Sequence, residues 1–578
     1  MSLTTALHVT MAGLGKTESQ LSVVSSNVTN ADKEGYTVKN FQSDYVTANG
    51  MTVPISGTVV GALDMDLYDT VIESKTTYGY FLPIADFFEQ YTSALGTTDG
   101  NSTLSSYMNN LESAISTLET SPSDSSAKVT VVNAADAVSR ELNSLSSTVQ
   151  GMRLEADLEI ERSVTTINQL LEELDALNEQ IMALRVNGSS TADAEDERMQ
   201  AVERLSEYLD ITYYINDNNQ VKIYTTTGKT LLDSNVHELS HTAVTSVSGT
   251  SVYPGSFGGI MINGVDITNS IQSGKLEGLI ELRDDLLVKE QDKLDEYAAA
   301  LTKTINTAFN DGTSYPARAQ VTSDLEALTA ADVFAGTGIV RIATVDGNGL
   351  VQGVTDLDLT TCATIGAVVA AIDGIAGISA SLNANGELVM NADNAGEGIS
   401  MNQMDSSVGA GADSFGMYFG FSNVFTKVGA EYIEVCDYLK SSPESLASSL
   451  LDNDPALAVG DTGLVAGNGS AVTAVSAALT GNVSFSAAGG FSAQSTSLSN
   501  YANKIVAHVA NASENANKES DTAKNLYEGL KTTMENATGV NIDEETAKMV
   551  ELESQYGASA VILSKLQELF DTLINAVR

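Results

Sequence analysis

The sequence predicts a multidomain α+β protein. In it, a long α-helical coiled-coil or bundle core, built from both ends of the chain, carries inserted β-rich domains. Three observations support this fold class. Apolar residues repeat every seven positions near both termini and in two internal stretches, which is the spacing of a coiled-coil seam. Short runs of alternating apolar residues with turn signals lie between these stretches. The 578 residues suffice for roughly three to five domains.

The chain is strongly acidic, with 75 Asp and Glu residues against 29 Lys and Arg residues and a formal net charge of −46. Nucleic acids and anionic membranes attract positively charged protein surfaces, so neither is expected as a partner. Two cysteines, Cys362 and Cys436, exclude a disulfide framework, although the sequence leaves a single bridge open. We expect free thiols that pack as small hydrophobic residues.

Residues 1–45 are expected to form the first terminal coiled-coil segment, with a helix over residues 3–31. Its apolar row repeats every seven residues and consists of Leu7, Leu14, Leu21 and Val28. Asn and Gly residues then favour a turn. Residues 36–60 look extended and predict a hairpin or linker, because Val53, Ile55 and Val59 alternate with small polar residues. The N-terminus lacks the basic and apolar regions of a cleaved secretory signal.

The helical bundle is expected to take three separate parts of the chain, residues 46–210, 271–312 and 491–536. Its clearest heptads lie between residues 154 and 184 and between residues 275 and 309, and these two helices can pair. The first helix carries two rows, Ile160, Ile167, Leu174 and Ile181 in one and Leu170, Leu177 and Leu184 in the other. The row of the second helix is Ile280, Leu287, Leu294 and Leu301.

Two β-rich regions interrupt the helices. Residues 211–270 predict a small β domain, because apolar strands flank turn signals at residues 217–219 and 227–229. Residues 313–490 are rich in Gly, Ala, Ser and Thr and predict a β-rich outer insert of one or two domains. This order implies that the chain runs from one end of the molecule to the other and then returns. The termini should therefore lie together, with the β domains at the far side.

Residues 537–578 are expected to form the second terminal coiled-coil segment. One row is Ile542, Met549, Tyr556, Leu563, Phe570 and Val577, and a second row joins at Leu552, Leu566 and Leu573. Isolated helices of this length are marginal in water. The two terminal segments should therefore pack on each other, on neighbouring copies of the chain, or on both. The predicted assembly interface comprises Leu7, Leu14, Leu21, Val28, Met549, Tyr556, Leu563, Phe570 and Leu573.

No catalytic, cofactor-binding or metal-binding residues are predicted, and we expect no enzyme activity. The fragment at residues 13–17 resembles the end of a phosphate-binding loop, but Thr10 stands where the pattern needs glycine. His237 and His241 have no third metal ligand nearby in the sequence. A catalytic pair of carboxylates, as in glycosidases, cannot be distinguished by its sequence pattern in a chain with so many acidic residues. Glycan binding or hydrolysis by residues 313–490 therefore stays an alternative.

Both termini resemble axial proteins of the bacterial flagellum. Asn27, Asn30, Gly35 and Tyr36 match the signature that opens rod, hook and first hook-associated proteins, although Ser26 and Lys33 depart from it. Other segments resemble the family of hook-associated protein 1, the hook-filament junction protein. They are residues 539–545 and 570–575 at the C-terminus, residues 167–181 and 274–311 in the bundle, and residues 359–390 and 415–459 in the insert.

This resemblance implies a structural protein without a cofactor, exported through the flagellar type III apparatus into the extracellular flagellum. It implies a ring of copies on the distal end of the hook, with the terminal helices forming an inner tube. The implied partners are the hook protein, a second hook-filament junction protein, further copies of the chain, and an export chaperone at the C-terminal helix. A hook protein or another rod or hook component is the alternative, which the long helices at residues 154–184 and 275–309 disfavour.

Overall fold

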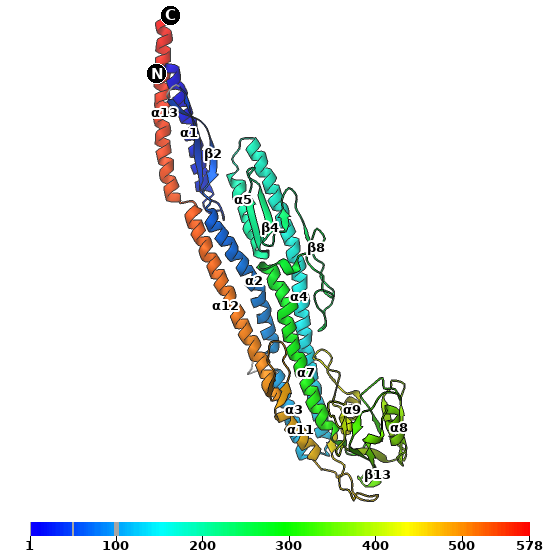
Figure 1. Cartoon of the computed structure of the whole chain (residues 1–578). Helices are drawn as coiled ribbons and strands as arrows, with labels where there is room; N and C mark the ends of the chain where they lie inside the picture. Colours follow the sequence, from blue (N-terminus) through cyan, green and yellow to red (C-terminus); the bar gives the residue numbers. More distant parts are fainter. Residues whose placement is uncertain (1, 49–50, 97–102, 578) are drawn as a thin grey trace.

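The computed structural model describes residues 2–48, 51–96 and 103–577 and shows an elongated molecule with both termini at one end (Figure 1). The first and last helices lie side by side at that end and run in opposite directions. A two-stranded antiparallel hairpin packs against the first helix. We call this part the terminal rod. Its elements are α1 (Leu3–Thr29), β1 (Lys39–Ala48), β2 (Met51–Gly61) and α13 (Ile542–Val577).

The bundle forms the middle of the molecule, and its longest helix, α4, spans about 90 Å at 1.5 Å per residue. The side chain of Asp124 starts this helix by accepting a hydrogen bond from the Ser126 backbone N–H at 2.8 Å. The helices are α2 (Met65–Leu95), α3 (Leu104–Thr120), α4 (Ser125–Val186), α5 (Ala192–Tyr208), α6 (Gly274–Glu281), α7 (Leu287–Asn310) and α12 (Leu498–Thr538).

The predicted heptad rows bury their side chains in this bundle. Ile160, Ile167 and Leu174 of α4 are fully buried, as is Leu294 of α7. The predicted pairing of the two helices is confirmed, because α4 packs against both α6 and α7. A π-helical turn at Leu282–Leu286 joins α6 to α7, an irregularity that the continuous heptad did not predict.

The small β region consists of two three-stranded sheets, and both predicted turns are confirmed. The turn at residues 217–219 joins β3 to β4, and the turn at residues 227–229 joins β4 to β5. The predicted position of this region is wrong, since it lies along α4 and α5 rather than at the far end (Figure 1). The strands are β3 (Ile211–Ile215), β4 (Val221–Thr225), β5 (Thr230–Leu232), β6 (Leu239–Ser240), β7 (Met261–Ile262) and β8 (Val265–Asp266).

Buried charges attach this region to the bundle. Asp157 of α4 accepts hydrogen bonds from Arg283 at 2.6 Å and from the backbone of Val244 at 2.8 Å, and it contacts His241 at 2.9 Å. Burial alone would raise the pKa of Asp157, but these hydrogen bonds hold it below its usual value. Arg283 also lies over the ring of Phe257 at 4.6 Å. Each buried charge thus has a partner, as a low-dielectric interior requires.

The outer insert lies at the end opposite the termini, as predicted (Figure 1). Its core gathers aromatic residues of α9 around α8 and the central sheet strands, and Cys362 lies in that core. Both cysteines are free and buried, which confirms the prediction for the thiols. The longer elements are β12 (Ile339–Asp346), β13 (Val351–Asp358), α8 (Ile365–Asp373), β14 (Ile378–Leu382), β15 (Leu388–Ala392), β16 (Glu397–Asn402), α9 (Phe415–Phe419), α10 (Asp437–Ser441) and α11 (Ser470–Thr480). Short strands complete it, namely β9 (Thr313–Ser314), β10 (Gln320–Thr322), β11 (Gly336–Thr337), β17 (Ser407–Val408), β18 (Phe425–Thr426), β19 (Glu434–Val435), β20 (Ala447–Ser449), β21 (Val483–Phe485) and β22 (Gln494–Thr496).

The domain boundaries stay a proposal. Helix α11 falls in the range assigned to the outer insert, yet it packs against α3 and α7 of the bundle. The hairpin β21–β22 follows it and also contacts α7. Part of the residue range 313–490 therefore packs onto the bundle and does not belong to a separate outer insert.

One carboxyl group in the bundle should make stability depend on pH. Burial, followed by the negative charges of Glu281, Asp210 and Asp284, raises the pKa of Glu277 to about 7. The stabilising contribution of its protonated form is complete below pH 4.5 and is lost as the pH rises to 7. We expect Glu277→Gln to raise the free energy of unfolding at pH 8 by about 1–3 kcal/mol and to change it little at pH 4. Urea unfolding at the two pH values measures this difference, and an equal gain at both would contradict it.

Candidate assembly site at the terminal helices

The seam between α1 and α13 is the core of the terminal rod. Val24 of α1 and Leu566 of α13 are buried, and most residues of the predicted rows on the two helices are half-buried. These half-buried residues are Leu7, Leu14, Leu21, Val28, Met549, Leu563 and Phe570. Two further residues of the predicted interface, Tyr556 and Leu573, are exposed. The side chain of Val577 lies outside the described residues.

Helix α13 also carries an apolar surface that faces solvent, of which the heptad rows predicted only Leu573. We call it the open face of α13. Ile562 and Leu569, seven residues apart, flank the seam, and Val561 lies one residue before Ile562. The members and their exposed fractions are Val550 (63%), Val561 (62%), Ile562 (53%), Leu569 (54%), Leu573 (60%) and Ile574 (53%). Pairs of adjacent apolar residues such as Val561-Ile562 could have indicated this surface in the sequence. Two adjacent residues of a helix point in different directions, so one narrow stripe cannot contain both.

The C-terminal part of α13 extends beyond the start of α1 (Figure 1). The two helices share their base, where Asn27 meets Glu545, and α13 has 36 residues against 27 in α1. The last turns of α13 therefore have no partner helix within the described chain. Ile562, Leu569 and Leu573 are spaced by seven and four residues, so they form one exposed apolar stripe on the helix, and such patches mark interaction surfaces.

Asn27 joins three elements of the rod at its base. Its amide nitrogen donates to the carboxylate of Glu545 at 2.8 Å and to the backbone carbonyl of Lys39 at 2.9 Å. Its amide oxygen accepts from the backbone N–H of Lys39 at 3.0 Å and from the hydroxyl of Tyr36 at 3.1 Å. Asn27 is fully buried and Glu545 is 1% exposed. The amide therefore makes four hydrogen bonds and ties α1 to both β1 and α13.

Lys39 and Asp196 connect the rod to the bundle. The Lys39 ammonium binds the carboxylate of Asp196 on α5, and it donates to Thr37 and to the Ala192 carbonyl at 3.0 Å each. The Asp196 carboxylate also accepts from the backbone N–H and the hydroxyl of Thr37 at 2.9 Å each. Burial raises the pKa of Asp196 although Lys39 and Thr37 favour its charged form. We call Asn27, Tyr36, Thr37, Lys39, Asp196 and Glu545 the joint.

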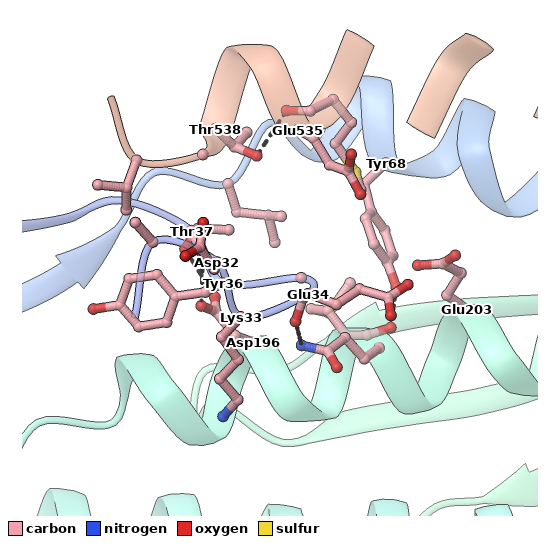
Figure 2. Close-up of a pocket in the computed structure, with 18 residues that line it drawn as sticks. Asp32, Lys33, Glu34, Tyr36, Thr37, Tyr68, Asp196, Glu203, Glu535 and Thr538 are labelled. Atoms are coloured by element: carbon pink, nitrogen blue, oxygen red, sulfur yellow. Dashed lines mark hydrogen bonds between the residues drawn. The ribbon is translucent and has the colours of Figure 1, made fainter. Parts of the chain in front are cut away.

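A cavity of about 350 Å³ lies beside the joint (Figure 2). The loop after α1, the helices α2 and α5, and the end of α12 line it, with Tyr68 and Glu203 on one side and Thr538 on another. Lys531 pairs with both Glu34 and Glu203, so these two acidic side chains of the wall already have a cation. The Thr37 hydroxyl in this wall donates to the Asp196 carboxylate, which Lys39 also binds, so that pair belongs to the joint.

The signature residues fall on this joint and its surroundings. Asn27 and Tyr36 are members of it, Asn30 ends α1, and Gly35 adopts a φ of +69° in the loop that follows. A side chain at Gly35 would also meet that of Gln200. Within the described residues, no group of three His, Cys, Asp or Glu side chains is placed to hold a metal ion. No helix of that same part is long and apolar enough to cross a membrane.

Comparison with known proteins supports the resemblance seen in the sequence. A family model described as the flagellar hook-associated protein FlgK helical domain matches residues 89–319. Flagellar hook-associated protein 1 of Salmonella typhimurium is 22% identical over 591 residues, which cover 99% of this chain and 100% of the relative. Flagellar hook-associated protein 1 of Bacillus subtilis is 23% identical over 343 residues, covering 53% of this chain and 67% of the relative.

A solved structure shares the fold. The flagellar hook junction protein FlgK from Burkholderia pseudomallei matches with a TM-score of 0.50 at 13% identity, covering 80% of this chain and 99% of that chain. The predicted fold class, long helices from both ends of the chain with β-rich insertions, is thereby confirmed.

Proposed function

We propose that this chain, which belongs to the flagellar hook-associated protein 1 family, is a structural component of the bacterial flagellum. It forms the junction between hook and filament by assembling on the distal end of the hook. The similarity over the full length of the Salmonella relative supports this role, because it includes the terminal rod as well as the bundle. The chain acts by holding its neighbours and not as an enzyme.

The open face of α13 is the observation that best supports the proposed assembly mechanism. An isolated subunit leaves this apolar surface in water, and burying it against neighbouring copies would be favourable. We propose that the terminal rods of successive copies pack through this face and through the α1–α13 seam. The interface then comprises Leu7, Leu14, Leu21, Val28, Met549, Tyr556, Leu563, Phe570 and Leu573, together with Ile562 and Leu569.

The proposed partners follow from the position of the junction. The ring of copies contacts the hook protein on one side and a second hook-filament junction protein on the other. Before assembly the chain passes through the flagellar type III apparatus, and an export chaperone covers the C-terminal helix. The same apolar residues of α13 would then serve two partners in succession, which is consistent with their exposure in the free chain.

Deletion of the gene gives the direct test. We expect hooks of normal length without filaments, and flagellin shed into the culture medium, because the filament would lack its attachment. Electron microscopy of the cells and an assay of flagellin in the medium measure the two effects. Missing hooks would instead indicate a hook or rod component, and intact filaments with normal motility would refute the flagellar role.

A further inference from the structure

The hairpin of the terminal rod has two edges, and the joint determines which backbone groups face outward. Lys39 points both its N–H and its C=O at Asn27, so these groups face away from β2. In an antiparallel pair, inward and outward residues alternate along each strand. Phe41 and Ser43 therefore also face outward on β1, and their partners across the ladder, Val59 and Gly57, face outward on β2.

The outward edge of β2 is unprotected by charge. Strand β2, residues 51–61, contains no Asp, Glu, Lys or Arg, although the chain carries a net charge of −46. Four of its residues are Val or Ile, two are Thr, and its one proline is Pro54, near the far end of the hairpin. Soluble proteins usually blunt a free strand edge with charged residues, because unpaired N–H and C=O groups recruit further strands.

These outward groups have no partner in the described part of the hairpin. No hydrogen bond reaches the backbone of Phe41 on the outer side of β1, or that of Gly57 or Val59 on the outer side of β2. A two-stranded hairpin on its own is marginally stable, and addition of a strand strengthens it. Each edge of the hairpin thus offers unbonded outward backbone groups to a further strand.

The edge of β1 opens into a groove of about 370 Å³. Lys39, Asn40 and Phe41 of this edge line the groove together with residues of α1 and α13. Lys16 and Lys548 line this groove, with Glu545 and Glu551 also present. Its walls come entirely from the terminal rod, so the groove is continuous with the α1–α13 seam of the proposed assembly interface.

We propose that the hairpins of neighbouring copies pair edge to edge, so that β2 of one copy, at Gly57 and Val59, adds to β1 of the next copy at Phe41. This inference rests on the proposed ring of copies. The occupant of the groove is a second copy of this chain, because the uncharged β2 edge supplies the complementary strand without bringing further negative charge to Glu545 and Glu551. When β2 of one copy occupies the groove of the next, the outward backbone groups of that β2 and of the β1 it meets form hydrogen bonds with each other.

The pairing is head to tail, since the two edges that meet are different. Interfaces of this kind form closed rings when the rotation between copies closes, and open helical arrays when it does not. A copy at each end of an incomplete array keeps one free edge. Assembly would therefore proceed by adding copies to free edges.

A proline at an outward position tests the pairing. Val59→Pro removes an N–H that points away from β1, which an edge strand tolerates. We expect this variant to fold and to be exported, but to leave a deletion strain without filaments. The matched control Val59→Ala retains the N–H and should restore filaments. Thr58→Pro removes an inward N–H of the ladder with Gln42 and should disrupt the hairpin itself. Full restoration of filaments by Val59→Pro would overturn the pairing.

Cross-linking keeps the test decisive if Val59→Pro fails to fold. Phe41→Cys and Val59→Cys are expressed as two separate chains in one deletion strain, so no disulfide can form within a hairpin. The native Cys362 and Cys436 are buried and do not compete. We expect oxidation of purified hook particles to give a cross-linked dimer only when both variants are present. Particles that contain both variants and give no dimer would overturn the pairing, whereas the gene deletion tests the junction role by itself.

Discussion

Replacing Ile562 and Leu569 together by aspartate is expected to abolish incorporation of the chain at the junction while the free chain stays folded. Both side chains are more than half exposed in the free chain, so the charges remain in water there. At the proposed interface between copies, each would have to enter an apolar contact, and burial of an unpaired carboxylate is strongly unfavourable. The penalty is repeated in every copy of the ring.

Complementation of a deletion strain measures this effect. We expect no filaments with the double variant, normal amounts of it in the medium, and a circular dichroism spectrum like that of the unchanged chain. Ser564→Asp with Gln567→Asp adds the same two charges at exposed polar positions of the same helix and should restore filaments. Filaments on cells that carry Ile562→Asp and Leu569→Asp would exclude the open face of α13 from assembly.

Replacing Asp196 by alanine is expected to lower the free energy of unfolding by about 3–5 kcal/mol, because it leaves the buried ammonium of Lys39 without its counterion. Lys39 is 3% exposed and has no second carboxylate among its hydrogen-bond partners, which are otherwise neutral oxygens. The backbone N–H and hydroxyl of Thr37 also lose their acceptor. The rod should then detach from α5 more readily.

Denaturant unfolding of the purified chain gives the free-energy change. The double variant Asp196→Ala with Lys39→Met removes both charges and should recover much of the loss, since no buried ion is left unpaired. Asp196→Asn is a nearly isosteric control that removes the charge alone. A loss as large in the double variant as in Asp196→Ala would mean that packing, and not the ion pair, makes the joint stable.

The helices were predictable because the spacing of apolar residues within each helix shows which side of the helix is buried. Rows such as Ile160, Ile167 and Leu174 bury one side of a helix, and a seven-residue spacing shows this without knowledge of the partner. The π turn at residues 282–286 left no such trace, because the apolar row from Ile280 to Leu287 continues through it. The position of the small β region was also missed, since the contacts of Asp157 with His241 and Val244 that attach it join residues 84 and 87 positions apart.

The residues of the joint could not be predicted from local sequence patterns either, because they meet only in the folded chain. Asn27 and Tyr36 were selected by resemblance alone, and no pattern in the residues around position 27 explains an amide there. The reason lies in Glu545, which is 518 residues away along the chain, and in the edge of β1. Lys39 and Asp196 were not selected at all, because a charged pair 157 residues apart in a chain with 75 acidic residues has no distinguishing pattern.

The chain crosses from the rod to the bundle twice, and this fixes how the molecule responds to torque. One crossing is the short link between β2 and α2, and the other is the short link between α12 and α13. Val38 bonds to both, because its N–H donates to the Thr538 carbonyl at 2.7 Å and its carbonyl accepts from the Ala62 N–H at 3.0 Å. A single covalent crossing would let the rod swivel about the long axis of the molecule. Two bonded crossings resist twisting, so a rotation applied to the rod turns the bundle and the outer insert with it.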